Sequence, residues 1–297
     1  MDLLAALASF IRVAETGSFS AVSREAGISQ PTVSRHVALL EQHFEVRLFN
    51  RTTRSFTVTQ DGRSLLTYAH QIADALEQAE AAVGRRQAVP KGMVRLGTTT
   101  AFGLYLSGRI GLLLNRYPDL ELDLVMHDSF GDMVEEGLDL TVRIGQPSEG
   151  SLITRHLWDV ERILVAAPAY LHRRKIPSEP NDLLDHLCIA YTYGTALREW
   201  EFKREDAIRV ISANGRFHAN NSEVVHKAAL AAMGIALLPI YQVEANLMTG
   251  QLVRLMPDWH APRLPLYLIY PGARTLPLRT RTVLDFLAQL PKSDGWS

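Results

Sequence analysis

Six apolar residues between positions 65 and 83 follow one another at alternating intervals of four and three residues. Such a repeat predicts a long helix with one apolar seam, lasting about three heptads, that must pack against another helix. Acidic residues flank the seam at Asp74, Glu77 and Glu80, and the pattern ends near Gly84 and Pro90. We therefore expect the seam to meet a second chain, with packing against its own subunit as the alternative. Its members are Leu65, Ala69, Ile72, Leu76, Ala79 and Val83.

Three shorter helices are expected before the seam. Apolar residues recur at helical spacing from Leu3 to Ala14, and this first helix ends at Gly17. Ser18 suits the N-cap of a second helix, which Gly27 closes in a left-handed conformation. The third helix begins around Ser29, with a proline in its first turn, where the missing N–H costs nothing. Its predicted buried stripe comprises Val33, Val37, Leu40 and Phe44.

The opposite face of the third helix carries slim polar groups and one guanidinium. Gln30, Ser34 and Ala38 lie four residues apart, with Arg35 beside them. Two helices joined by a glycine turn, the second presenting such a face, suit the major groove of DNA, where Gln and Arg can bond to base edges. A plain solvated helix face is the alternative.

A basic segment follows the third helix. Residues 56–58 alternate like a strand and predict a wing whose tip carries Arg51 and Arg54. Arginines on a protruding turn suit phosphates or a narrow minor groove. Because the formal net charge of −1 gives the whole chain no field that attracts nucleic acid, any DNA contact must be local. Residues 29–58 supply that patch, with Arg35, Arg47, Arg51 and Arg54 against Glu41 and Glu45.

Beyond Gly92, short strands alternate with helices. This alternation is typical of an α/β unit, in which we expect mostly parallel strands. Residues 120–126 predict a half-buried strand, and residues 104–117 predict a helix. Further strands are expected at 94–97, 140–144, 163–166, 189–191, 217–220, 235–238 and 266–270, and further helices at 222–233 and 279–290.

Composition limits where the chain can act. Cys188 is the only cysteine, which excludes an internal disulfide and a cysteine-rich zinc site and predicts a buried thiol in a reducing compartment. Asp2 and the short apolar run that ends at Ala8 do not fit a signal peptide, and no segment holds ~18 consecutive apolar residues. We therefore expect a cytoplasmic protein that does not enter a membrane.

The segment from Phe10 to Leu66 closely resembles the N-terminal domain of the LysR-type transcriptional regulators. The resemblance continues more weakly at Asp139–Gly145 and at Ala228–Pro239, where Ala232 replaces the first usual glycine of the family's sensing domain. The residues that carry the first match are Phe10, Val13, Ala14, Gly17–Phe19, Ser29–Pro31, Val33–Arg35, Leu39–Glu41, Leu48, Phe49, Arg51, Thr52 and Thr59–Gly62.

This resemblance implies a fold that is α/β overall and has three parts. A mainly helical winged helix-turn-helix would cover residues 1–58, a dimerising linker helix 59–90, and an effector-binding domain 91–297. The last domain would be similar to type 2 periplasmic binding proteins, with two lobes joined by two crossing strands. The lobes would span about residues 92–161 with 268–297, and about 162–267.

The resemblance also implies partners. They are double-stranded DNA at promoters or operators, other copies of the chain in a homodimer or tetramer, RNA polymerase at target promoters, and a small molecule between the two lobes. No metal or other cofactor is implied.

Pattern and resemblance together assign the residues that contact DNA. Gln30, Ser34 and Arg35 are assigned to base edges, with Arg35 as a bidentate partner of guanine. The residues assigned to phosphate at the start of the helix are Ser29, Pro31 and Thr32, and those that anchor the wing are Arg51, Thr52 and Arg54.

The effector is expected where strands end and helices begin. Thr98, Thr99 and Thr100 lie between a strand and a helix, so hydroxyls and amides converge where an anion is favoured. Aromatic neighbours such as Phe102 and Phe130 favour a small carboxylate with an apolar body. The other residues assigned to this site are Ser129, Tyr193, Asn220, Asn221 and Ser222, and plain helix capping is the alternative for the last three.

Two other classes of protein are less consistent with the sequence. An enzyme would need a residue set that carries chemistry, and nucleophile elbows, phosphate loops, dinucleotide turns and His-Glu-x-x-His pairs are missing. His127, His156 and His218 fit structural roles or ligand contacts better than metal binding. A solute-binding protein for transport would lack the helix-turn-helix.

Overall fold

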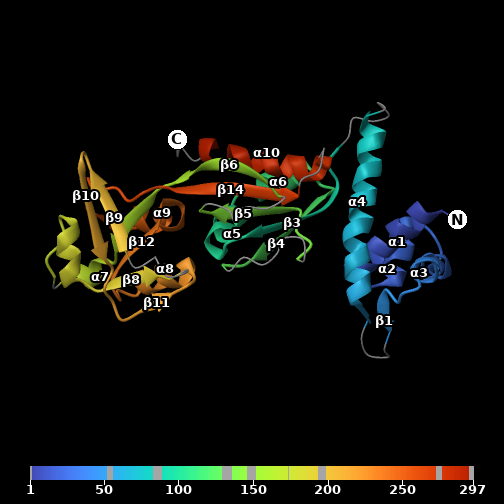
Figure 1. The fold of residues 1–297 in the computed structure, drawn as a ribbon, viewed down its shortest axis with the longest axis horizontal. Helices are drawn as coiled ribbons and strands as arrows, with labels where there is room; N and C mark the ends of the chain where they lie inside the picture. The colour runs from blue at the N-terminus through green and yellow to red at the C-terminus, as the bar shows by residue number, and fades with distance from the viewer. Residues whose placement is uncertain are drawn as a thin grey trace. The chain divides into compact units, whose positions relative to one another are not determined.

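The computed structural model describes residues 2–51, 56–82, 89–128, 136–145, 152–172, 174–192, 199–271 and 276–293. The chain divides into two compact units, Met1–Val89 and Pro90–Ser297, each of which is described by itself (Figure 1).

The N-terminal unit contains the helices that the sequence predicts. Gly17 and Gly27 close the first two helices with left-handed φ angles of 64° and 65°, as expected. Thr59 Oγ1 accepts a hydrogen bond from Gly62 N at 2.9 Å and so caps the long helix. The elements are α1 (Leu3–Thr16), α2 (Phe19–Ala26), α3 (Gln30–Phe44), β1 (Phe49–Arg51), β2 (Phe56–Val58) and α4 (Gln60–Ala82).

The core of this unit lies between α1, α3 and α4. Phe10, Val37 and Leu40 are fully buried in it, as is Ala69 of α4. The expected burial of Phe44 was wrong, because its side chain is 42% exposed. Phe44 is the last residue of α3, where the buried stripe of this helix extends beyond the core. Glu45 then turns the chain in a left-handed conformation.

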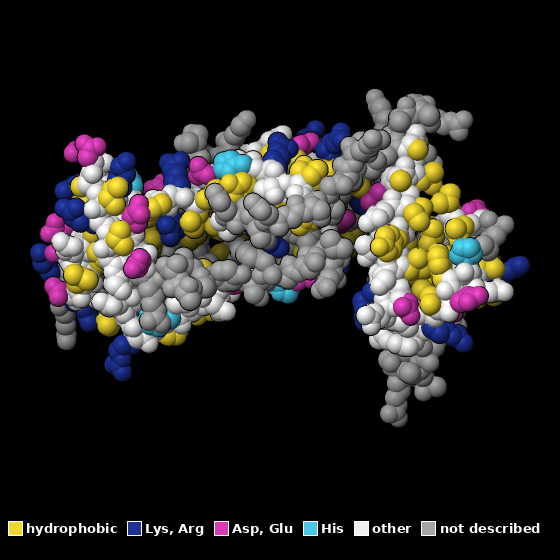
Figure 2. All heavy atoms as spheres, viewed as in Figure 1, with side chains coloured by type: hydrophobic (Ala, Val, Ile, Leu, Met, Phe, Trp, Pro, Cys, Tyr) yellow, Lys and Arg dark blue, Asp and Glu magenta, His cyan; other side chains and the backbone are white. Residues whose placement is uncertain are grey.

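The seam of α4 divides into two parts. Leu65 and Ala69 pack into the core of their own subunit, which is the alternative that the sequence left open. Ile72 and Leu76 are 43% and 42% exposed, and apolar side chains lie along α4 on the face that Figure 2 shows. The first part of the seam is therefore buried in its own subunit, whereas Ile72 and Leu76 form an apolar stripe that the single chain leaves exposed.

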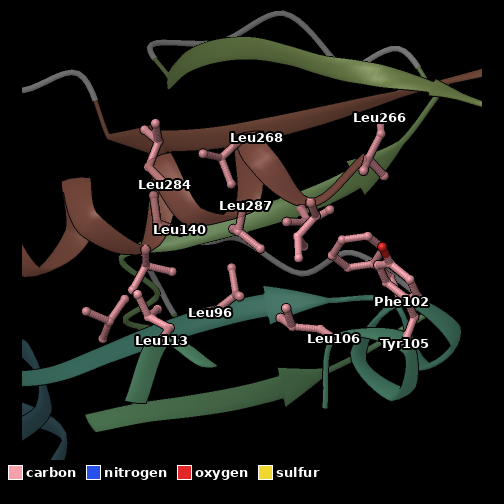
Figure 3. Packing of buried hydrophobic residues seen from close by; sticks show 14 of the residues in the cluster. Leu96, Phe102, Tyr105, Leu106, Leu113, Leu140, Leu266, Leu268, Leu284 and Leu287 are labelled. Carbon is pink, nitrogen blue, oxygen red and sulfur yellow. The ribbon is translucent and has the colours of Figure 1, made fainter. Parts of the chain in front are cut away.

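The first sheet of the C-terminal unit has the strand order β4-β3-β5-β14-β6. A core of leucines and aromatic rings fills the space between this sheet and its helices; Figure 3 labels Leu96, Phe102, Tyr105, Leu106, Leu113, Leu140, Leu266, Leu268, Leu284 and Leu287. We call this sheet and its helices the first lobe. Its elements are β3 (Gly92–Thr98), α5 (Thr100–Ser107), α6 (Gly111–Arg116), β4 (Leu120–Met126), β5 (Leu140–Ile144), β6 (Leu152–Val160), β14 (Leu264–Pro271) and α10 (Leu278–Ser293).

The second sheet has the order β11-β8-β12-β7-β13, and with its helices and one separate hairpin it forms the second lobe. Cys188 is buried there, as expected, and burial raises the pKa of its thiol to about 12. The elements are β7 (Arg162–Ala166), α7 (Pro168–Leu171), η1 (Pro180–Asp185), β8 (Cys188–Tyr191), β9 (Glu199–Arg204), β10 (Ala207–Ser212), β11 (His218–Ala219), α8 (Ser222–Leu230), β12 (Ile235–Pro239), α9 (Ile240–Met248) and β13 (Val253–Leu255).

The expectation of mostly parallel strands is confirmed in both five-stranded sheets, where four strands run in one direction. The exceptions are β14 and β7, each of which pairs with both of its neighbours in antiparallel fashion. One other expectation for this unit was wrong. The single helix expected over 104–117 is two helices, since α5 ends at the C-cap Gly108 and α6 begins at Gly111.

The chain crosses between the lobes at two places. It leaves β6 at Val160 and starts β7 at Arg162, and it returns to the first sheet at Leu264. The guanidinium of Arg162 donates to the carbonyl oxygen of Pro262 from Nε at 3.3 Å and from Nη2 at 3.1 Å. The two crossing segments are therefore bonded to each other.

The close packing of Gly62 yields a stability prediction. A Cβ built on Gly62 would collide with the backbone oxygen of Leu48 and lie 2.7 Å from Cγ1 of Val58. We expect Gly62→Ala to lower the unfolding free energy of the N-terminal unit by about 1–3 kcal/mol, because backbone must shift to admit the methyl group. Chemical denaturation followed by circular dichroism measures this loss.

Gly111→Ala is the matched control, because a Cβ there meets nothing within 4 Å. This substitution should leave stability unchanged or raise it slightly, since alanine favours a helix. Equal stability of Gly62→Ala and the unmodified chain would contradict the packing described here.

Candidate functional site

The outer face of α3 presents the side chains that the sequence assigned to DNA. Gln30, Pro31 and Arg35 are exposed, and Thr32 and Ser34 are half-buried. Ser29 is the N-cap of the helix, and its Oγ accepts from the backbone N–H of Thr32 at 3.3 Å. The exposed residues lie opposite the buried valines of the same helix, so this face is available to a partner.

Contacts behind α3 fix its position. His36 Nδ1 lies 2.7 Å from Oγ of Ser9, a residue of α1 that is only 6% exposed. On the neighbouring helix α2, Ser20 Oγ donates to Oε1 of Gln30 at 3.2 Å, so the Gln30 amide is held by a side-chain hydrogen bond. Sequence reasoning missed Ser20, the second residue of α2, because the contact joins two helices and the pattern of one helix does not report it.

The wing is described only in part. β1 and β2 pair in antiparallel fashion, with Arg51 opposite Phe56. The side chain of Arg51, and Thr52 and Arg54 as a whole, lie outside the described residues. Before the wing, Arg47 is exposed, 3.8 Å from a carboxylate oxygen of Glu41.

The three threonines expected to bind an effector stand in different surroundings. Thr98 is 2% exposed, and its hydroxyl has no hydrogen-bond partner in the described part of the chain. Thr99 is the N-cap of α5 and accepts from Phe102 N at 3.4 Å. Thr100 begins α5, and both its backbone N–H and its hydroxyl donate to a carboxylate that the sequence analysis did not assign, that of Asp128.

Asp128 connects the two lobes. Oδ1 accepts from Thr100 N at 3.0 Å, and Oδ2 accepts from Thr100 Oγ1 at 3.3 Å. Oδ2 also accepts from Nδ2 of Asn221 in the second lobe, and the same amide lies 3.3 Å from Thr100 Oγ1. Asp128 comes two residues after β4 and directly before Ser129, the residue that the sequence assigns to the effector, so the end of this strand is the signal that points to it.

Asn221 has two roles at once. Its Oδ1 accepts from Val224 N at 3.0 Å, which makes it the N-cap of α8, as the capping alternative expected. Its Nδ2 makes the contacts with the first lobe. Asn220 is exposed and Ser222 is half-buried, whereas Ser129, Phe130 and Tyr193 are among the residues that the structure does not describe.

Aromatic rings pack close to the start of α5. The ring centroid of Phe102 lies 5.9 Å from that of Tyr241 in the second lobe, and Tyr105 lies 5.2 Å from the same ring. Burial raises the pKa of the Tyr241 phenol, and the negative charge of Asp128 raises it further, so the phenol stays protonated. Phe102 is completely buried and belongs to the core of the first lobe.

The described residues form neither a metal site nor a membrane-spanning helix. No group of three or more His, Cys, Asp or Glu residues there could hold a metal ion. Among the same residues, no helix combines the length and apolar character that a membrane crossing requires.

Two family models match the chain. The bacterial regulatory helix-turn-helix of the lysR family matches residues 4–63, and the LysR substrate binding domain matches residues 87–291. The second model alone covers more than half of the chain.

Similar proteins match over nearly their whole length. The probable transcriptional regulator LtrA of Klebsiella pneumoniae is 31% identical over 293 residues, which are 97% of this chain and 95% of LtrA. DmlR of Escherichia coli is 32% identical over 295 residues, which are 97% of this chain and 94% of DmlR.

Solved structures agree. CrgA of Neisseria meningitidis, described as a LysR-type transcriptional regulator, has a TM-score of 0.62 and 27% identity, with 96% of this chain and 97% of CrgA covered. The virulence activator AphB of Vibrio cholerae has a TM-score of 0.58 and 26% identity, with 96% of this chain and 98% of AphB covered. These matches confirm the expected fold. The chain belongs to the LysR family and is a DNA-binding transcriptional regulator whose activity is modulated by an effector bound to its C-terminal domain.

Proposed function

We propose that α3 reads base edges in the major groove through Gln30, Ser34 and Arg35. The observation that carries this proposal is the exposed face of a helix whose opposite side, including Val33 and Val37, is fully buried. An α-helix fits the major groove, and arginine can bond to O6 and N7 of guanine together. The residues proposed to contact the backbone are Ser29, Pro31 and Thr32 at the start of the helix, and Arg51, Thr52 and Arg54 in the wing.

We further propose the three-part organisation inferred from the sequence, with residues 1–58 for DNA, 59–90 for dimerisation and 91–297 for the effector. Two copies would meet through the exposed seam residues Ile72 and Leu76 of α4. Dimers would pair into tetramers, and the bound protein would act on RNA polymerase at its target promoters in the cytoplasm. The relatives are named regulators, and binding rather than catalysis accounts for this activity.

For the effector, we propose a small carboxylate with an apolar body, bound between the lobes. Its carboxylate would lie at the N-terminus of α5, where backbone amides favour an anion. The residues proposed to hold it are Thr98, Thr99, Thr100, Ser129, Tyr193, Asn220, Asn221 and Ser222. A neutral compound that releases DNA at lower concentration than any carboxylate would contradict this proposal.

DNA recognition is tested by mixing the purified protein with sheared DNA from its source genome and sequencing the retained fragments. We expect a few sites to be enriched and Arg35→Ala to lose them. The loss should amount to about 1–3 kcal/mol of discrimination, because one bidentate base contact is removed. Arg54→Ala is the comparison, since a phosphate contact should weaken binding to all sequences alike and lower its salt dependence. Equal losses on specific and random DNA for Arg35→Ala would refute this division.

Dimerisation through α4 is tested by Ile72→Glu combined with Leu76→Glu. These side chains are exposed in the single chain, so the change should leave the helix folded while a charged seam prevents pairing. Light scattering should give a monomer mass at micromolar concentration, and circular dichroism should be unchanged. Gln71→Glu, on the outer face of the same helix, should remain dimeric. A dimer mass for the double variant would exclude this stripe as the interface.

A further inference from the structure

Asp128 uses the hydrogen-bond donors that a carboxylate effector would need. Its two oxygens accept from the backbone N–H of Thr100, from the Thr100 hydroxyl and from the Asn221 amide. Thr100 N is the first amide of α5, an eight-residue helix whose N-terminus favours negative charge. The Asp128 carboxylate therefore stands where the effector's carboxylate is proposed to bind.

These donors cannot serve two carboxylates fully. A backbone amide has a single N–H, and a hydroxyl donates only one hydrogen bond. Two carboxylates at one helix N-terminus would also repel each other. An incoming anion and Asp128 therefore compete for Thr100 and Asn221.

We propose that Asp128 is an internal competitor of the effector, which holds the two lobes together until a ligand carboxylate displaces it. Displacement breaks the hydrogen bond from Asn221 in the second lobe to Asp128 in the first. Ligand binding is thereby coupled to the contact between lobes, because one carboxylate takes part in both. This inference rests on the proposed effector site and names Asp128 as the residue that couples ligand binding to the contact between the lobes.

A buried polar group next to the cluster supports an anion position there. Thr98 lies two residues before Thr100, is 2% exposed, and has a hydroxyl without a partner among the residues described. Burying a hydroxyl without a hydrogen bond is costly, so a ligand that bonds to it would gain affinity. The backbone oxygen of the same residue accepts from His127 N at 2.9 Å, which places it beside the segment that carries Asp128.

The test is to remove Asp128 and supply a free carboxylate. In full-length Asp128→Ala, the vacated donors should bind acetate. Sodium acetate at ~0.1 M should then raise the melting temperature of the effector domain by about 3 °C over sodium chloride at equal ionic strength. Hydrogen exchange at the Thr100 amide should be at least ~10-fold faster in the variant and should slow again when acetate is added.

Three other chains complete the comparison. The unmodified protein should respond much less to acetate, because acetate must first displace Asp128 from the same donors. Asp206→Ala makes the same change of net charge on an exposed turn between β9 and β10 and should behave like the unmodified protein. Asp128→Asn keeps the side-chain volume without the charge, so its acetate response should lie between those of the alanine variant and the unmodified protein.

The proposal is overturned if neither Asp128 variant gains an acetate response, or if all four chains respond equally. If the alanine variant does not fold, the proposal is tested with Asp128→Asn alone. The readouts are then the rise of its melting temperature with acetate and the hydrogen-exchange rate of its Thr100 amide. The result is separable from the proposed regulator function. If the protein enriches genomic sites but neither Asp128 variant responds to acetate, the regulator function stands and the proposed role of Asp128 falls. If an Asp128 variant responds to acetate but the protein enriches no DNA, the role of Asp128 stands and the proposed DNA recognition falls.

Discussion

The packing of α4 against α1 connects the two activities proposed for the N-terminal unit. Leu65 and Ala69 complete the core that also buries the inner face of α3, so the first part of α4 belongs to the same compact unit as the proposed recognition helix. Ile72 and Leu76 continue the same helix with apolar side chains that the single chain leaves exposed. Because one helix carries both stretches, pairing two chains through it would fix two recognition helices relative to each other.

In the C-terminal unit, the contact between the lobes is polar where a ligand is expected. Asp128 gathers donors from both lobes, whereas the rings of Phe102, Tyr105 and Tyr241 pack against one another nearby. Apolar packing changes little when one small molecule arrives, but a shared carboxylate can be exchanged for another. On the proposal made above, the polar contact, rather than the aromatic one, is the part that a ligand would switch.

Local features were predictable from the sequence, whereas features that depend on distant neighbours were not. Caps, glycine turns and helical periodicity predicted α1 to α3 nearly to the residue, because each acts within a few positions. The antiparallel placement of β14 and β7, the exposure of Phe44 and the contacts of Asp128 depend on segments far apart in the chain. Asn221 illustrates both cases, since its capping of α8 could be predicted from the sequence and its contact with Asp128 could not. Ala232 adopts a left-handed conformation with φ of 58°, which is the region that favours glycine.

Selection of binding sites from random-sequence duplexes tests the central claim most directly, that paired recognition helices read DNA. If two chains meet through α4, the selected sequences should contain two half-sites related by dyad symmetry. Their centres should lie about one helical turn or a multiple of it apart. The symmetry should disappear for the chain with glutamate at positions 72 and 76. A selected motif without any repeat, equally well bound by that variant, would contradict the account.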